Sequence, residues 1–323
     1  MPAVWEVETF IERTKMVMQG VWKTMEEKSP DSFIMPEYDV PTIIPDDITI
    51  DQYVLKKTMV RVIACVSDLH LGSKYSVINP FSKDENGAPY GKNDGQLTLF
   101  SYWKDFCAKC DEVHADTVFV LGDTCHGPDR KGGGENLITP NLNAQVNMAE
   151  DLLEMLIQPG RKSYFVPGSP YHSAIYAGQL EKFLCERFGG SWGVVQNLTP
   201  KEFPNKTFCL SHGGGGAMFY RETAQAREMI YGRVAYADKK LPNISMYVHG
   251  HFHWFNYMHQ VNGHSLQLPC WTALEPLPMF IKNYTKAQPD IGGAIIFMDE
   301  AGRITVWHMG YPLPHIADEV QEM

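Results

Sequence analysis

The sequence predicts an α/β protein with two sheets, and three features of the chain indicate this. Buried-type strands alternate with helices in the first half, while shorter strands separated by turns fill the second half. The chain has 323 residues, of which 44% are hydrophobic, which is enough for one large domain with a well-buried core. We therefore expect an α/β sheet from the first half and a second, more antiparallel sheet from the second half.

The first-half elements follow one another regularly. The apolar run at 59–68, MVRVIACVSD, is typical of a strand that is covered on both faces. Helices are expected at about 94–110 and 143–157, and they lead to further strands at 117–123 and 163–168. This alternation predicts neighbouring strands joined by helical connections.

The second half is interrupted by one predicted helix, at about 217–238. Its short, turn-punctuated runs are typical of strands in a more antiparallel sheet. We assign all six runs to the second sheet: VVQNL (194–198), KTFCLSH (206–212), SMYVHGH (245–251), HSLQLP (264–269), GGAIIFMD (292–299) and RITVWHMG (303–310).

The N-terminal part differs in character from the rest of the chain. Apolar residues recur at helical spacing at 4–26, and a Pro- and Asp-rich stretch without periodicity follows at 29–50. We predict an N-terminal helix and Pro-rich strap at 1–58 and a compact domain at 59–323.

Composition narrows the class of protein. Lys and Arg number 28 against 38 Asp and Glu, and the formal charge of −10 disfavours binding of nucleic acid by charge alone. The seven cysteines form no paired motifs at zinc-ribbon spacing, as is typical of reduced thiols. No apolar stretch reaches the length of about 18 residues that a membrane span needs. We expect a cytoplasmic protein with no membrane partner, and the sequence leaves its oligomeric state open.

Metal-ligand residue types follow four of the predicted strands. The groups are Asp68-Leu69-His70, Gly122-Asp123, Ser211-His212 and His251-Phe252-His253. Carboxylate and imidazole ligands suit a divalent transition metal, and open sheets bind ligands at the carboxyl ends of their strands. One such group alone is typical of ordinary loops, but core packing does not explain four. The sequence therefore predicts a metal site at these strand ends.

The order of the motifs resembles that of the calcineurin-like metallophosphoesterase superfamily. The matching segments are DLH at 68–70, GD at 122–123, a G-x-x-x-H turn at 168–172, SH at 211–212 and GHFH at 250–253. The turn is similar to that of a phage-type subgroup with Gly-Ser/Thr-x-x-His. The resemblance implies a four-layer α/β/β/α sandwich of two mixed sheets flanked by helices.

The resemblance also implies a dinuclear metal centre and its ligands. Asp68, His70 and His253 would hold one ion, His212 and His251 the other, and Asp123 would bridge them. The cofactors implied are two divalent metal ions, with manganese favoured and iron, zinc or nickel as alternatives.

The turn at 168–172, Gly-Ser-Pro-Tyr-His, departs from the superfamily's usual Gly-Asn-His. We expect the hydroxyl of Ser169, or a water, to replace the Asn ligand, and His172 to serve as general acid or phosphate partner. In the alternative interpretation, Pro170 and Tyr171 only shape a turn and His172 is idle.

Three further residues are candidates for substrate binding. His126 lies just past Asp123, Gly213 begins a glycine run that lets backbone N–H groups approach a phosphate, and Arg221 lies on the helix predicted at about 217–238. Each has an ordinary structural interpretation: a loop histidine, a flexible hinge and a solvated helix residue.

The favoured function is that of a metal-dependent phosphoesterase, which hydrolyses phosphate esters with metal-activated water. A phosphodiester or nucleotide-type substrate is favoured, so the expected partner is a phosphate ester, with nucleotides and nucleic acid included. The alternative is a non-catalytic scaffold or binding subunit with the same fold, which the altered turn at 168–172 favours and the six-residue ligand set opposes.

Overall fold

The computed structural model describes residues 59–84, 86–129, 133–173, 179–213, 221–261, 263–273 and 288–314. The predicted N-terminal helix and strap, and the predicted boundary at residue 58, lie outside these residues and stay predictions. The start of the predicted helix at 217 also lies outside them.

The first sheet is mixed and has six strands in the order β11-β10-β1-β2-β3-β4. Strands β1, β2, β3 and β4 run parallel, whereas β10 and β11 run antiparallel to their neighbours. The strands are β1 (Met59–Val66), β2 (Thr117–Leu121), β3 (Lys162–Val166), β4 (Ser191–Trp192), β10 (Ile291–Asp299) and β11 (Ile304–Tyr311). The alternating strands and helices of the first half thus form the predicted parallel units.

The assignment of the last two strands to the second sheet was wrong. Strand β10 pairs with β1, with Ile63 opposite Ile296, and β11 continues the same sheet. All nine residues of β10 are buried, as expected of a strand that lies between two neighbours and is covered on both faces. The chain therefore returns to the first sheet after completing the second.

The second sheet has five strands in the order β5-β6-β7-β9-β8 and is also mixed. Strands β6, β7 and β9 are parallel, and β5 and β8 pair antiparallel at its two edges. The strands are β5 (Gln196–Leu198), β6 (Thr207–Ser211), β7 (Ile244–His249), β8 (Asn256–Gln260) and β9 (Gly263–Gln267). The sheet is more parallel than predicted, and its strand β8 had not been expected.

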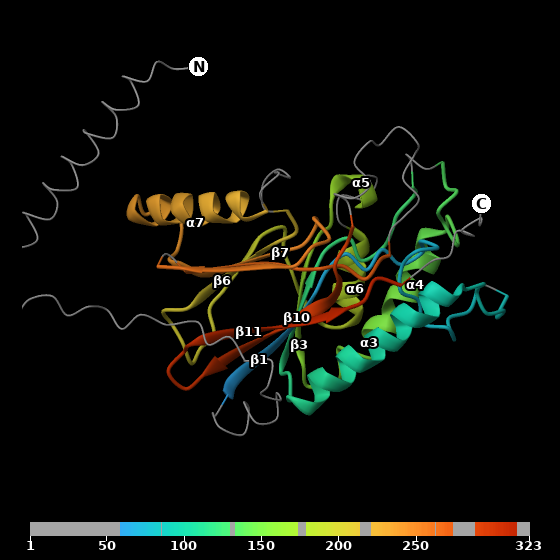
Figure 1. Cartoon of the computed structure of the whole chain (residues 1–323), viewed down its shortest axis with the longest axis horizontal. Coiled ribbons are helices and arrows are strands. Elements are labelled where there is room, and N and C mark those ends of the chain that lie inside the picture. Colours follow the sequence, from blue (N-terminus) through green and yellow to red (C-terminus); the bar gives the residue numbers. More distant parts are fainter. Residues whose placement is uncertain are drawn as a thin grey trace, which may run out of the picture. The chain divides into compact units, whose positions relative to one another are not determined.

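Helices cover the outer faces of both sheets, so the domain has four layers, as Figure 1 shows. The first sheet is covered by α3 (Asp94–Glu112), α4 (Leu142–Leu153) and α6 (Gln179–Arg187), and the second by α7 (Glu222–Ala237). A short helix, α5 (Pro170–Ser173), follows β3. The predicted fold class, two mixed sheets flanked by helices, is confirmed. In the described part of the chain, every helix is too short or too polar to cross a lipid bilayer.

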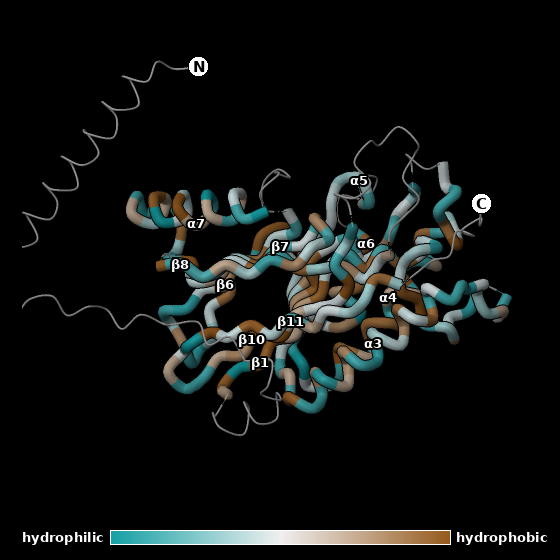
Figure 2. Tube along the Cα trace, in the orientation of Figure 1, coloured by the Kyte–Doolittle hydropathy of each residue, from teal (hydrophilic) through white to brown (hydrophobic). Residues whose placement is uncertain are grey.

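Both faces of the first sheet are buried, in two separate cores. Val118 and Val120 of β2 pack in the core under α3 and α4, whereas Phe119 and Leu121 pack between the sheets. Apolar and polar residues alternate along α3 (Figure 2). The buried residues of this helix include Trp103. The parallel strands are thus held from both sides, which fixes the positions of their carboxyl ends.

We predict that Phe119→Ala lowers the free energy of unfolding by about 3–5 kcal/mol, because Phe119 is 2% exposed and its ring lies 6.0 Å from that of Phe208 in the other sheet. Urea denaturation measures the change. Phe81→Ala is the control: Phe81 is 78% exposed, and its loss should cost less than about 0.5 kcal/mol. Equal effects of the two substitutions would show that the contact between the sheets adds nothing to stability.

Candidate metal centre

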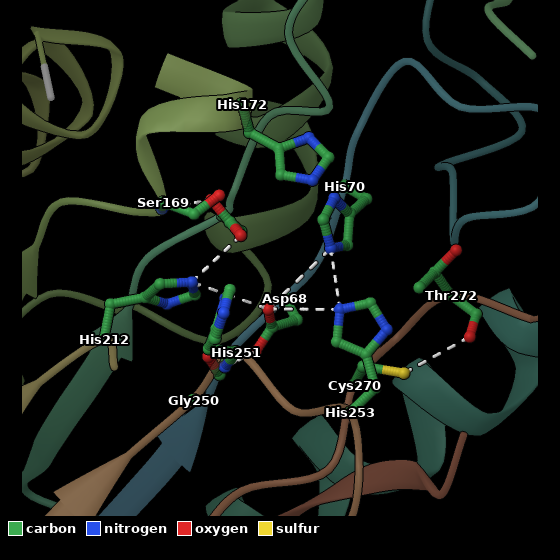
Figure 3. Close-up of polar contacts among 12 residues, drawn as sticks. Asp68, His70, Ser169, His172, His212, Gly250, His251, His253, Cys270 and Thr272 are labelled. Atoms are coloured by element: carbon green, nitrogen blue, oxygen red, sulfur yellow. Dashed lines mark hydrogen bonds and ion pairs between the residues drawn. The ribbon is translucent and has the colours of Figure 1, made fainter. Parts of the chain in front are cut away.

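The strand ends of both sheets bring the predicted ligands together, as Figure 3 shows. Asp68 and His70 follow β1, Asp123 follows β2, and His212 follows β6. The loop after β7 supplies His251 and His253. Parallel strands place their carboxyl ends at one edge of a sheet, and the two sheets present these edges to the same site.

Five of these six residues have a left-handed backbone, which is uncommon for residues other than glycine. They are Asp68 (φ 53°), His70 (φ 49°), Asp123 (φ 47°), His251 (φ 82°) and His253 (φ 59°). Such conformations cost about 1–3 kcal/mol each and persist only where the surroundings hold them. Their concentration here is typical of a functional site.

Three glycines allow the turns to approach one another closely. A Cβ at Gly250 would lie 1.8 Å from Ser67 Oγ, and one at Gly122 would lie 2.7 Å from His212 Nδ1. A Cβ at Gly168 would lie 2.0 Å from Asp123 Oδ1. These distances exclude any side chain, so the glycines permit the packing of the ligand-bearing turns.

One carboxylate oxygen of Asp68 is held by hydrogen bonds and the other is not. Oδ2 accepts from Ser67 Oγ at 2.6 Å and from the backbone N–H of His251 at 2.7 Å. Oδ1 is buried without a hydrogen bond, and the Nε2 atoms of three histidines surround it: His253 at 3.3 Å, His70 at 3.7 Å and His212 at 3.9 Å. Asp68 thus offers one oxygen to a cluster of imidazole nitrogens.

The carboxylate of Asp123 lies between two turns. Its Oδ1 accepts from the backbone N–H of Ser169 at 2.7 Å, and its Oδ2 lies 2.9 Å from His212 Nε2. The other ring nitrogen of His212, Nδ1, lies 2.6 Å from the carbonyl of Leu121 and therefore donates to it. This contact orients Nε2 toward the carboxylates.

The described residues include two groups whose ligand atoms lie within 4.8 Å of one another and match the two predicted ion sites: Asp68, His70 and His253, and Asp123, His212 and His251. Mixed carboxylate and imidazole donors, with a buried Asp68 oxygen that lacks a hydrogen bond, fit a divalent transition metal. The assignment of individual ligands stays a prediction.

The electrostatics of the cluster favour ionised carboxylates. Burial alone would raise the pKa of Asp123, but the charge and hydrogen bond of His212 hold it well below its usual range. Burial likewise opposes the charge on His212, yet Asp123 and Asp68 raise its pKa to about 9. Burial and the charge of His172 lower the pKa of His70 to about 3, so its imidazole is neutral. Ionised carboxylates and a neutral His70 are forms that bind a cation, whereas His212, with its raised pKa, must lose a proton before it can bind one.

The altered turn brings Ser169 and His172 to the same site. Ser169 Oγ lies 3.3 Å from Asp123 Oδ1, so the hydroxyl contacts the predicted bridging carboxylate. The ring of His172 lies 4.4 Å from that of His70, and its Nδ1 lies 2.5 Å from the carbonyl of His126. His172 also forms a third possible ligand group with His70 and His126. His172 is therefore beside the cluster rather than out in the solvent.

The three predicted substrate-binding residues differ in their surroundings. His126 is 2% exposed, so it lies in the wall of the site rather than on a surface loop. Gly213 is exposed, and a Cβ there would meet no atom within 4 Å. Arg221 is 40% exposed, pairs with Asp290 at 3.4 Å and lies over the ring of Trp254.

The sequence interpretation missed two supporting carboxylates. Glu181 of α6 is 1% exposed, and it accepts a hydrogen bond from the backbone N–H of Thr124, next to Asp123. Burial, reinforced by the charge of Asp123, raises its pKa to about 7. Glu228 of α7 lies 2.6 Å from Nε2 of His249, whose Nδ1 lies 2.9 Å from Ser211 Oγ. No motif marks either residue, because both act through contacts between distant elements.

No protein-family model matches the chain, and no curated protein matches it. The chain is similar to several solved structures. A dimetal phosphatase from Danio rerio has 10% identity and a TM-score of 0.40, and the match covers 79% of this chain and 100% of that one. An archaeal phosphodiesterase has 8% identity and a TM-score of 0.38, over 76% and 99% of the two chains. Vps29 from Entamoeba histolytica, complexed with zinc, has 14% identity and a TM-score of 0.37, over 77% and 98%.

We predict that Gly168→Ala lowers metal affinity at least about tenfold, because the new Cβ would displace the Asp123 carboxylate. Metal content per chain after dialysis, measured by mass spectrometry, reports the loss, and circular dichroism verifies folding. Gly91→Ala is the matched control, since a Cβ at Gly91 meets nothing within 4 Å. Unchanged metal content in folded Gly168→Ala would contradict the predicted role of Asp123 as a ligand.

A second prediction concerns stability and pH. The pKa of Glu181 is raised from 4.5 to about 7, so the folded protein keeps a proton that the unfolded chain loses, and stability falls as pH rises from about 4.5 to 7. In the chelator-treated protein, Glu181→Gln should reduce this pH-dependent loss of stability by up to about 3 kcal/mol. Urea denaturation at pH 5 and pH 8 measures it.

The matched control for this prediction is Glu186→Gln, on the exposed face of the same helix. It should alter stability by less than about 0.5 kcal/mol at both pH values. If Glu181→Gln and the wild type lose the same stability between pH 5 and pH 8, the buried carboxyl is not the source of the pH dependence.

Proposed function

We propose that the protein is a metal-dependent hydrolase of phosphate esters, with phosphodiester or nucleotide-type substrates favoured. One observation carries this proposal: two adjoining groups of carboxylate and imidazole donors meet at the carboxyl ends of strands from two sheets. Core packing does not explain a buried Asp68 oxygen that lacks a hydrogen bond among three imidazole nitrogens.

Each donor group would hold one divalent cation. Asp68, His70 and His253 would bind the first, His212 and His251 the second, and Asp123 would contact both, with Ser169 near the second. Manganese is favoured, with iron, zinc and nickel as alternatives. Bound cations supply positive charge to the phosphate oxygens and lower the pKa of water at neutral pH.

The protein's own residues orient these donors. Ser67 and the backbone of His251 fix the Asp68 carboxylate, and the backbone of Ser169 fixes that of Asp123. Because each carboxylate is hydrogen-bonded on one side, its ligand geometry is set before substrate arrives, which reduces the reorganisation needed during reaction.

His172 is the proposed proton donor to the leaving oxygen. Its Nδ1 donates to the carbonyl of His126 at 2.5 Å, which fixes the ring and leaves Nε2 to exchange a proton with substrate. Proton transfer from a positioned histidine typically contributes a factor of about 10²–10⁴ in rate.

A binding subunit without catalysis is the second candidate. It is favoured by Ser169, which stands at the usual Asn position and whose N–H and hydroxyl both contact Asp123. The two candidates differ in metal content and turnover: the enzyme requires two cations per chain, whereas the scaffold needs none.

We predict that the wild type with added Mn²⁺ hydrolyses bis-p-nitrophenyl phosphate or p-nitrophenyl phosphate. Asp123→Ala should abolish turnover, because Asp123 is the carboxylate proposed to contact both cations. His172→Asn should slow it at least about tenfold through loss of the proton donor. Release of p-nitrophenol measures all rates, and the preferred ester distinguishes a diesterase from a monoesterase.

His114→Asn serves as the control, since His114 is an exposed histidine with a left-handed backbone outside the site. It should retain the wild-type rate. If the folded wild type cleaves neither ester with any of the four metals, the protein is a binding subunit.

A further inference from the structure

A row of flat side chains leads outward from the metal centre. The ring of His251 lies 5.1 Å from that of Phe252, and Phe252 stacks on Trp254 at 4.9 Å with 9° between their planes. The guanidinium of Arg221 lies 4.8 Å from the centre of the Trp254 ring. We call Phe252, Trp254 and Arg221 the rim stack. It is continuous with the centre because its first ring neighbours a predicted metal ligand.

The rim stack is held by a carboxylate from a distant segment. Asp290 Oδ2 lies 3.4 Å from Arg221 Nη1 and accepts from the backbone N–H of Phe255 at 2.8 Å. The backbone N–H of Asp290 donates to the carbonyl of His253 at 2.8 Å. Asp290 thus ties Arg221 and the loop after β7 together, so the stack is ordered in advance.

The stack is also accessible to a ligand. Phe252 and Trp254 are only half-buried, and the Arg221 side chain is 40% exposed. Aromatic residues that serve only as core are usually covered completely, as Trp103 and Trp271 are here. Half-exposed aromatic rings capped by a guanidinium form a surface on which a flat group of a ligand can stack.

We propose that the rim stack binds the base of a nucleotide substrate, while the phosphate lies at the metal centre. This inference rests on the proposed function and adds the residues that would recognise the base of such a substrate. Rings and guanidinium groups recognise any base by its flat face, so the site tolerates different bases. The net charge of −10 disfavours long-range attraction of a nucleic acid backbone. We therefore expect the protein to recognise the ligand through the base next to the reacting phosphate.

The test compares esters that differ only in the base. The substrates are a thymine dinucleotide and the same dinucleotide with one base removed, and the enzymes are wild type, Trp254→Leu, Trp254→Phe and Tyr231→Leu. We expect the wild type to have about a tenfold lower KM for the intact dinucleotide. Trp254→Leu should remove this preference, whereas Trp254→Phe, which keeps an aromatic ring at this position, should retain it. Tyr231, which is 64% exposed on α7, is the control, and its substitution should leave the preference intact.

A purely structural role of the stack has a different signature. If Trp254→Leu lowers kcat equally for both dinucleotides and the wild type shows no difference in KM, the stack only positions His251 and His253, and the proposal is wrong.

Binding measurements separate this proposal from the proposed function. Titration calorimetry of the metal-loaded protein with adenosine monophosphate and with ribose 5-phosphate requires no turnover. Tighter binding of adenosine monophosphate, lost in Trp254→Leu, supports the base site even if no ester is cleaved. Equal binding of the two overturns it even if esters are cleaved. A base effect with the mononucleotide but not with the dinucleotide would show that the rim stack binds the base of free nucleotides.

Discussion

The position of Asp123 holds the strand ends of both sheets together. Its backbone carbonyl accepts from the N–H of His70 after β1 at 2.9 Å, and its side chain accepts from Ser169 after β3. The same side chain contacts His212 after β6, in the other sheet. One buried residue thus joins turns from four strands. An ionised carboxylate is stable there because surrounding donors and imidazoles outweigh the cost of burial.

Much of the site could be predicted from sequence because its residues follow strands directly. Parallel strands of one sheet bring their carboxyl ends together, so Asp68 and Asp123 had to lie close once their strands were identified. The approach of His212 from the other sheet was implied only by the resemblance. The place of β10 could not be predicted, because β1 and β10 are far apart in the sequence and no local pattern indicates that they pair. Met59, for example, pairs with Asp299. Glu181 was missed for the same reason. Its role depends on the turn against which its helix packs, and the sequence does not show that contact.

The inner and outer parts of the site are built differently. Short turns supply the inner part, with glycines at Gly122, Gly168 and Gly250 that allow close packing. The outer part combines a helix start, a loop and a residue from far along the chain, Arg221, Trp254 and Asp290. Turn geometry therefore constrains the inner part more tightly than the outer part.

The left-handed backbone of five cluster residues also bears on how such a protein can evolve. Glycine tolerates this conformation best, asparagine, aspartate and histidine adopt it several-fold more often than other residues, and β-branched residues tolerate it least. Substitution of His70, His251 or His253 by a β-branched residue would therefore add backbone strain to the loss of an imidazole, which narrows the residue types that can stand at these positions.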